Sequence, residues 1–437
     1  MFLTHFRSRI LAAVVAVSTV ALSVVALGSC EGDAAHLSGP KGATAFDRFI
    51  VIGTGLSMGA QSGGIYFESQ VGSWPALIAK SAGVNFRQAL LRAPGCQPPR
   101  IAPLQLSVYL SGASVTGIDS TCAGTIDTLT PPMNNLAISG ATAYAALFLT
   151  PKLVLNAVAP YPAGDRARYP LVLGSTQSQV TAMRIEGASF VAVELGMAEV
   201  LGAATSGLLV PATSYTQTAP YTYVPSSVFE PVYTAIADSV KLTGAKVALI
   251  GVPDVTRIYG MRVAAELWND RAELATFGVI VNANCGTSPN SVFTGSLIPS
   301  LYAQYAATGA PQNLSCADVP GTADAVLTPA DLVTLSSAVT AMNTKIQAVA
   351  QQNGWAFVDL FDVYPNLAVR AAYTAAEQLA CVYPYGALTS LDGVFPNAAG
   401  QQQIAYAVDA AINAKYGFTL PVAQPAGLGA AAAKLCP

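Results

Sequence analysis

Charged side chains and histidine are scarce in this chain of 437 residues. The first shortage argues against nucleic-acid binding, and the second argues against a metal site. Asp, Glu, Lys and Arg make up only 10% of the residues and the net charge is −3, so the basic surface that nucleic-acid binding needs is missing. The two histidines, His5 and His36, lie near the amino terminus, and no Cys-x-x-Cys spacing occurs. We therefore expect no nucleic-acid partner, no cofactor and no metal site, although a metal site is the competing explanation for the cysteines.

Apolar sequence is abundant instead, at 52% of the residues, and its first run predicts export. A short basic segment ends at Arg9, and residues 10–27 follow without a charge. This order is typical of a signal peptide. The next residues complete Leu27-Gly28-Ser29-Cys30, which resembles the bacterial lipobox, whose cysteine is lipid-modified and becomes the first mature residue. An uncleaved membrane anchor and plain secretion are the alternatives.

These patterns divide the chain into four parts. Residues 1–29 are the predicted lipoprotein signal peptide, and residues 30–45 form a flexible tether that starts at the lipid-bearing Cys30. Residues 46–415 form the predicted domain, and residues 416–437 form a tail that wraps the surface. The protein is thus expected to be exported and held by its lipid on a bacterial membrane, at the periplasmic face or the cell surface.

Seven cysteines are present, and setting Cys30 aside for lipidation leaves an even set of six. An even set in an exported protein predicts disulfides, here three, although six cysteines permit 15 connectivities. We favour pairing between neighbours because each pair brackets one loop-rich stretch. The predicted pairs are Cys96–Cys122, Cys285–Cys316 and Cys381–Cys436.

Apolar runs alternate with helical patterns through residues 46–415. Buried strands are predicted at residues 46–52, 188–195, 246–254 and 355–361, and helices within 65–83 and at 328–353 and 401–415. This alternation predicts one layered α/β domain with a parallel sheet. Residues 85–132 are expected to form a lid or rim with an edge hairpin at 105–110. Residues 254–302 are expected to be irregular, with a second insertion around Cys285.

Short motifs follow the predicted strands in a recognisable order. They are Gly53-Thr54-Gly55-Leu56, Gly140 after the run 135–139, Gly196-Met197-Ala198-Glu199, and Asp392 followed by Phe395-Pro396-Asn397 and Gly400. Together they resemble the conserved blocks of the GDSL (SGNH) hydrolases, a family of esterases and lipases. The resemblance implies a flavodoxin-like three-layer α/β sandwich with a central parallel sheet and loop insertions.

The resemblance also implies that the reacting groups are missing. The nucleophilic serine of the family falls on Gly55, the general-base histidine on Phe395, and the oxyanion-binding asparagine on Ala198. Gly140, whose backbone N–H would help bind an oxyanion, and the orienting Asp392 are retained. Three losses at the three chemical positions predict that the Ser-His-Asp mechanism is absent.

Three other side chains are candidates to replace the missing catalytic groups. Ser57 is a fallback nucleophile, but without an evident base it is better explained as a turn serine. Glu199 and Asp392 form a candidate acid–base pair of the kind that glycosidases use, against a structural role in which Asp392 caps backbone N–H groups. Both alternatives stay open at this stage.

A noncatalytic role in the cell envelope is the leading hypothesis, in ligand binding or in assembly with an envelope protein partner. An acyl chain or another apolar ligand would occupy the former active site. Its predicted lining is Thr54, Gly55, Ser57, Gly140, Met197, Ala198, Glu199 and Phe395. The alternatives are an active esterase or lipase that uses other residues, a structural surface or matrix subunit, and a filled cleft with the functional surface elsewhere.

Overall fold

The computed structural model describes residues 40–112, 122–156, 163–361, 374 and 377–421. All described helices and strands belong to the compact unit Gly42–Pro437. The predicted signal peptide, Cys30 and Cys436 lie outside the described residues. Within these ranges, no helix combines the length and the apolarity needed to cross a bilayer.

A parallel sheet of four strands forms the centre of the unit, as the sequence predicts. Its strands are β1 (Phe49–Ile52), β2 (Phe190–Glu194), β3 (Lys246–Ile250) and β9 (Ala356–Val358), and they lie in the order β1-β2-β3-β9. Every residue of β1 and β2 is buried, because helices cover both faces of the sheet. The predicted run 135–139 continues the sheet beyond β1, where Leu136 N–H donates to Val51 O at 2.8 Å.

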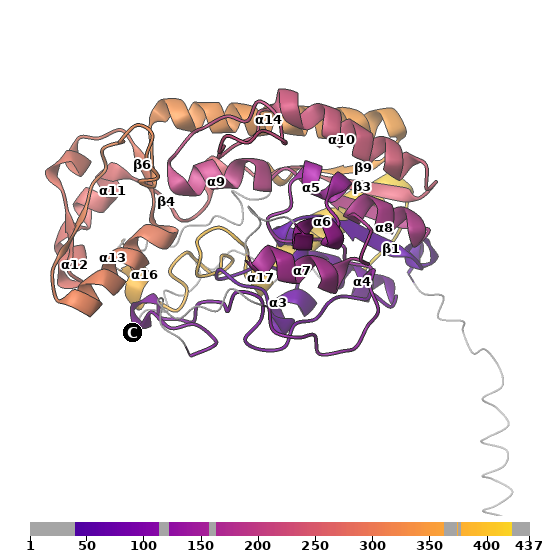
Figure 1. Ribbon diagram of the computed structural model, residues 1–437, viewed down its shortest axis with the longest axis horizontal. Helices are drawn as coiled ribbons and strands as arrows, with labels where there is room; N and C mark the ends of the chain where they lie inside the picture. The colour runs from indigo at the N-terminus through magenta and orange to yellow at the C-terminus, as the bar shows by residue number, and fades with distance from the viewer. Residues whose placement is uncertain (1–39, 113–121, 157–162, 362–373, 375–376, 422–437) are drawn as a thin grey trace, which may run out of the picture. The chain divides into compact units, whose positions relative to one another are not determined.

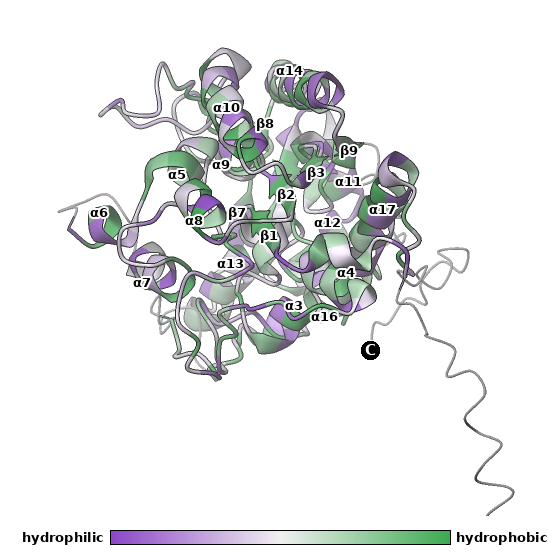
Figure 2. Ribbon diagram, turned by 90° about the vertical axis from the view of Figure 1, so that its right-hand side faces the viewer, coloured by the Kyte–Doolittle hydropathy of each residue, from purple (hydrophilic) through white to green (hydrophobic). Residues whose placement is uncertain are grey.

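Helices cover the two faces of this sheet (Figure 1). One face packs against α14 (Pro329–Asn353), which is flanked by α10 (Ser226–Lys241). The opposite face packs against α17 (Ala398–Tyr416), which is flanked by α4 (Trp74–Ala82). Figure 2 shows the hydrophobic strands enclosed between helices that mix hydrophobic and hydrophilic residues. The domain therefore has the three-layer α/β arrangement that the resemblance implies.

Local sequence explains the ends of α14. Thr328 and Asp331 form a capping box, in which the Thr328 hydroxyl accepts from Asp331 N–H at 3.2 Å. Pro329 occupies the first helical position, where its missing N–H costs nothing. The helix ends before Gly354, whose φ of 68° is the left-handed conformation that glycine adopts without strain.

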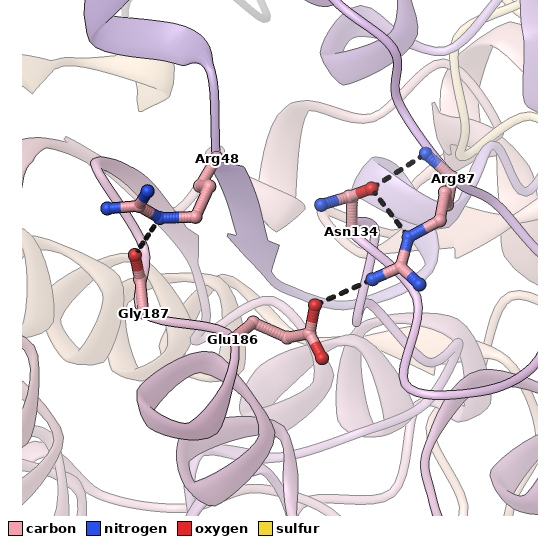
Figure 3. A network of polar contacts seen from close by, with 5 residues as sticks. All are labelled: Arg48, Arg87, Asn134, Glu186 and Gly187. Atoms are coloured by element: carbon pink, nitrogen blue, oxygen red, sulfur yellow. Dashed lines mark hydrogen bonds and ion pairs between the residues drawn. The ribbon is translucent and has the colours of Figure 1, made fainter.

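Polar contacts fix the amino-terminal side of the sheet, away from the motifs (Figure 3). The Arg48 guanidinium donates to the carbonyl of Gly187. Arg87 pairs with Glu186 at 2.6 Å, and its backbone N–H donates to Asn134 Oδ1 at 2.9 Å. These contacts join the entry of β1 to the turn before β2.

Shorter helices complete the main core. They are α2 (Gly55–Met58), α3 (Phe67–Val71), α5 (Ala143–Phe148), α6 (Pro151–Asn156), α7 (Ala163–Val172), α8 (Gln179–Ile185) and α9 (Ala198–Ser206). Among them, α2 and α9 begin where β1 and β2 end, and so they carry the predicted site.

The expectation that residues 254–302 are irregular is wrong. Together with residues up to 327 and 377–380 they form a satellite region with a hydrophobic core of its own, which includes Leu267, Leu274 and Val279. Its strands are only two or three residues long, too short to leave a periodic pattern in the sequence. Its elements are β4 (Met261–Val263), α11 (Ala264–Asn269), α12 (Arg271–Thr276), β5 (Val279–Val281), β6 (Ser291–Phe293), α13 (Thr294–Thr308), β7 (Gln312–Leu314), β8 (Val326–Leu327) and α16 (Glu377–Ala380).

Two of the three predicted disulfides are present. Cys96 bonds to Cys122, and Cys285 bonds to Cys316 inside the satellite core. Cys381 is buried, but Cys436 lies outside the described residues, so their pairing stays a prediction.

The predicted edge hairpin at residues 105–110 is present in a short, irregular form, in which residues 108–110 pair with residues 99–101. A single 3₁₀ turn, Leu104–Leu106, lies there, followed by Ser107 at a φ of 51°. One antiparallel bridge joins Arg100 to Tyr109. The left-handed Ser107 reverses the chain early and prevents a regular ladder.

Candidate functional site

The first and last motifs meet at the carboxyl end of β1. Gly55 opens α2, and a Cβ atom built on it would lie 3.2 Å from Cζ of Phe395 and 3.0 Å from Oγ of Ser139. The structure thus brings together the nucleophile position, the base position and the run that carries Gly140, as the resemblance implies. A side chain on Gly55 would therefore begin in tight contact with the phenylalanine ring and Ser139.

The residues around Phe395 have structural contacts of their own. Asp392 Oδ1 accepts from the N–H groups of Val394 and Phe395 at 2.8 and 2.9 Å. Its Oδ2 accepts from Gly63 N–H at 3.0 Å. This is the capping role weighed above, and it does not require a histidine.

The end of the same motif starts α17. Asn397 Oδ1 accepts from Ala399 N–H and Gly400 N–H at 3.0 and 3.1 Å, which caps the helix. A Cβ on Gly400 would lie 2.2 Å from the carbonyl oxygen of Leu388, so only glycine fits. Gln401, in the first turn, accepts from Trp74 N–H at 2.9 Å and donates to Leu56 O at 3.1 Å.

Ser57 is completely buried and is bound to Glu194, the last residue of β2. The Ser57 hydroxyl donates to Glu194 Oε2 at 2.9 Å, and the Thr54 hydroxyl donates to Oε1 at 2.8 Å. The N–H groups of Thr54 and Ser57 also donate to Oε2, at 2.9 and 3.2 Å. Burial raises the pKa of Glu194 from 4.5 to about 7, against these hydrogen bonds, which lower it.

Glu194 is not among the predicted site residues, although a lone acidic residue at the end of an apolar strand was a usable signal. Its carboxylate is the group closest to a base for Ser57. However, a serine with no exposed surface cannot reach a substrate without rearrangement. The Ser57–Glu194 contact therefore fixes the turn after β1 against β2.

Glu199 lies in the first turn of α9 and is also buried, with 1% of its surface exposed. Its Oε1 accepts from Ala143 N–H at 2.6 Å and from the Tyr215 hydroxyl at 2.9 Å. Its Oε2 has no hydrogen-bond partner within the described part of the chain. Burial raises its pKa to about 7, and burial beside Glu199 raises the pKa of Tyr215 above the usual tyrosine range.

The hydrogen bonds of Glu199 and Asp392 go to different elements, which is the structural role weighed above for Asp392. Asp392 holds its own turn, whereas Glu199 holds the start of α5 and Tyr215. Ala198 begins α9, and its methyl group cannot donate to an oxyanion. Met197 is buried.

A cavity of about 190 Å³ opens beside Gly140. Gly140 has a φ of 81°, and a Cβ built on it would meet no atom within 4 Å. Of the eight residues predicted to line a ligand pocket, Gly140 lines this cavity, whereas Thr54, Ser57, Met197 and Glu199 are buried. The hydrogen bonds to Glu194 hold Thr54 and Ser57 inside, which the sequence did not reveal.

Tyrosines dominate the walls of this cavity. The rings of Tyr144 and Tyr215 are stacked, with centroids 5.5 Å apart and an angle of 18° between their planes. None of the described residues that line it is an Asp, Glu, Lys or Arg. These described residues are Ser139, Gly140, Ala141, Thr142, Tyr144, Ala145, Leu149, Tyr169, Tyr215 and Tyr221.

A metal centre is not formed by the residues that the structure describes, since no three His, Cys, Asp or Glu side chains among them are grouped to hold an ion.

Comparison with known proteins finds similar solved structures only. Mutants of Axe2, an acetylxylan esterase from Geobacillus stearothermophilus, match at 10–12% identity and TM-scores of 0.32–0.34, covering 83% of this chain and 92% of theirs. TesA matches at 14% identity and a TM-score of 0.31, covering 84% of this chain and 98% of its own. No family model and no curated protein matches the chain. The description of the fold above depends on the sheet, its helices and the placement of the motifs.

Proposed function

We propose that this chain is a noncatalytic, hydrolase-like binding component of the bacterial cell envelope, with its ligand in the tyrosine-lined cavity beside Gly140. The observation that carries this proposal is the position of Phe395, whose Cζ lies 3.2 Å from the point where a side chain on Gly55 would begin. A ring in this place supports the loss of an attacking group and excludes a substrate from the same space.

The lining of the cavity indicates the class of ligand. Tyrosine rings offer apolar faces, and the side chains of Ser139 and Thr142 carry hydroxyl groups for hydrogen bonds. Because the lining carries no charge, the ligand is a neutral molecule with an apolar face and hydroxyl groups, such as a single sugar ring. A volume of about 190 Å³ suits a small molecule of this kind rather than a long acyl chain.

Attachment to the envelope is the second half of the proposal. It rests on the lipobox-like Leu27-Gly28-Ser29-Cys30 and is supported by the two disulfides, which are typical of exported proteins. A lipid on Cys30 would hold the domain at the membrane surface, where an envelope protein partner is accessible. Mass spectrometry of the membrane-extracted protein tests it: a diacylated or triacylated amino-terminal Cys30 is expected, and an unmodified or uncleaved chain would contradict it.

The absence of ester hydrolysis is tested on a protein of residues 31–437, which contains the whole compact unit. We expect no turnover of short or long acyl esters and no fluorophosphonate label by intact mass. The competing function, an esterase built on Ser57, is favoured by the Ser57–Glu194 hydrogen bond of 2.9 Å. Turnover that disappears in Ser57→Ala, with the label on Ser57, would establish that esterase and overturn the proposal.

Ligand binding is tested by thermal shift with neutral methyl glycosides, compared with short alcohols of similar size. A glycoside that stabilises the wild type is expected to have no effect on Tyr144→Ala, which removes one of the stacked rings. The matched control is Tyr406→Ala, on the exposed side of α17 and outside the cavity lining. Equal shifts in all three proteins would show that the cavity is not the binding site.

A further inference from the structure

A second cavity, of about 210 Å³, lies between the loop of residues 100–109 and helix α13 of the satellite region. Most of the described residues that line it are apolar, and Arg100 is the one charged residue among them. The apolar members are Ile101, Leu104, Val108, Tyr109 and Pro299, and the hydroxyl-bearing members are Ser107, Ser296 and Ser300. A largely apolar lining with one cation suits a ligand with an apolar body and an anionic end.

Backbone hydrogen bonds hold the loop as one wall of this cavity. Ile101 N–H donates to Val108 O at 3.1 Å, and Leu110 N–H donates to Pro99 O at 2.9 Å. Arg100 N–H donates to Ser62 O at 2.8 Å, which ties the loop to the main core. The wall is therefore formed before any ligand arrives, and so little ordering is needed on binding.

The Arg100 guanidinium contacts a backbone carbonyl and a tyrosine hydroxyl. Its Nη1 donates to Gly295 O at 2.9 Å and its Nε approaches the Tyr109 hydroxyl at 3.4 Å. It forms no salt bridge with any residue that the structure describes. Asp392 lies in the same surroundings, because both it and Arg100 act on the buried Tyr385. The oxygens of Asp392 already accept from its own turn and from Gly63.

We propose that this second cavity binds a medium-chain fatty acid, with its carboxylate on the Arg100 guanidinium and its chain along Leu104, Val108 and Pro299. A guanidinium has five N–H donors and binds carboxylates in a bidentate manner. Two exposed leucines of the same loop, Leu106 and Leu110, are 53% and 41% exposed and add apolar surface near the cavity. This site is separate from the tyrosine-lined cavity and does not depend on its function.

Titration calorimetry with decanoate, decanol and decyltrimethylammonium tests the proposal on residues 31–437. The wild type is expected to bind decanoate more tightly than decanol, and not to bind the cationic probe. Arg100→Gln is expected to weaken decanoate binding about tenfold or more, because a charge-assisted contact is lost. The matched control is Arg92→Gln, an exposed arginine of the same insertion that is outside the cavity lining.

A second variant tests binding in this cavity if Arg100→Gln does not fold. Ser300→Trp places a large side chain at an exposed position of the lining, on α13, and leaves Arg100 intact. It is expected to abolish decanoate binding without lowering the melting temperature, whereas Tyr144→Ala should bind decanoate normally. Decanoate binding that is absent in the wild type, equal to decanol binding, or unchanged in Ser300→Trp would overturn the proposal.

Discussion

The turns after β1 and β2 each depend on one buried glutamate, and the two glutamates differ in how completely they are bound. Glu194 accepts hydrogen bonds from both the N–H and the hydroxyl groups of Thr54 and Ser57. Glu199 uses one oxygen for Ala143 and Tyr215, while its other oxygen has no partner within the described ranges. The Glu194 carboxylate therefore fixes a turn. The Glu199 carboxylate binds Tyr215 of the tyrosine-lined cavity, and its Oε2 can accept a further hydrogen bond.

This difference shows that burial and pKa alone do not identify a functional acid. Both glutamates are fully enclosed and burial raises the pKa of each to about 7. What separates them is the set of donors around each oxygen. Glu194 accepts from four donors of the turn after β1, and Glu199 positions Tyr215, which lines the cavity.

Replacement of the two glutamates is the strongest test of the comparison. Glu194→Ala leaves four buried donors without an acceptor, so we expect a loss of about 3–5 kcal/mol of unfolding free energy. Glu199→Ala should cost less, about 1–3 kcal/mol, because it leaves only the donors of Ala143 and Tyr215. Urea unfolding measures both. Equal losses would contradict the distinction between the two sites.

The dependence of the unfolding free energy on pH is the next largest effect that we expect. Each glutamate titrates at 4.5 when exposed and at about 7 in the folded protein, so the folded state binds more protons between these values. The contribution of each is therefore complete below pH 4.5 and is lost as the pH rises through 7, by on the order of 3 kcal/mol per glutamate.

The urea midpoint of the wild type should accordingly be higher at pH 5 than at pH 8. Glu199→Gln keeps the shape of the side chain and removes one titrating group. It should therefore reduce the difference between the urea midpoints at pH 5 and pH 8 by about half. A midpoint that rises between pH 5 and pH 8 would show that the two carboxyls are not held in their protonated forms.

Restoring a serine to the first turn tests the crowding at Phe395. Gly55→Ser is expected to destabilise the protein by about 1–3 kcal/mol, because the new Cβ meets Phe395 and Ser139. Adding Phe395→His should recover part of this loss, and a double-mutant cycle measures the coupling. The control is Gly124→Ser, where a new Cβ would meet no atom within 4 Å. Purely additive losses would mean that residues 55 and 395 do not meet.

A partly buried glutamate provides the smallest effect. The Glu186 side chain is 25% exposed and pairs with Arg87 at 2.6 Å (Figure 3). Glu186→Gln is expected to cost less than about 1 kcal/mol, with the cost falling further in high salt. Thermal unfolding at two salt concentrations measures it, and a cost as large as that of Glu199→Ala would show that burial is not the deciding factor.

The central architecture was predictable because its signals are local. The apolar runs of β1 and β2 and the Thr328-Pro329 start of α14 act within a few residues of sequence. The role of Glu194 was not predictable, since its partners Thr54 and Ser57 lie about 140 residues earlier. The tyrosine-lined cavity likewise joins Tyr144 to Tyr215 from separate segments, and the satellite strands are too short to show a period.

The contacts of Asn397, Gly400 and Gln401 have a consequence for the history of the domain. These residues cap α17, allow the close approach to Leu388 and join α17 to Trp74 and Leu56. None of these contacts involves a reacting group, so selection for folding alone would preserve them after an activity had disappeared. The most recognisable motif of the chain therefore reports how α17 is built and attached, and it does not identify a substrate.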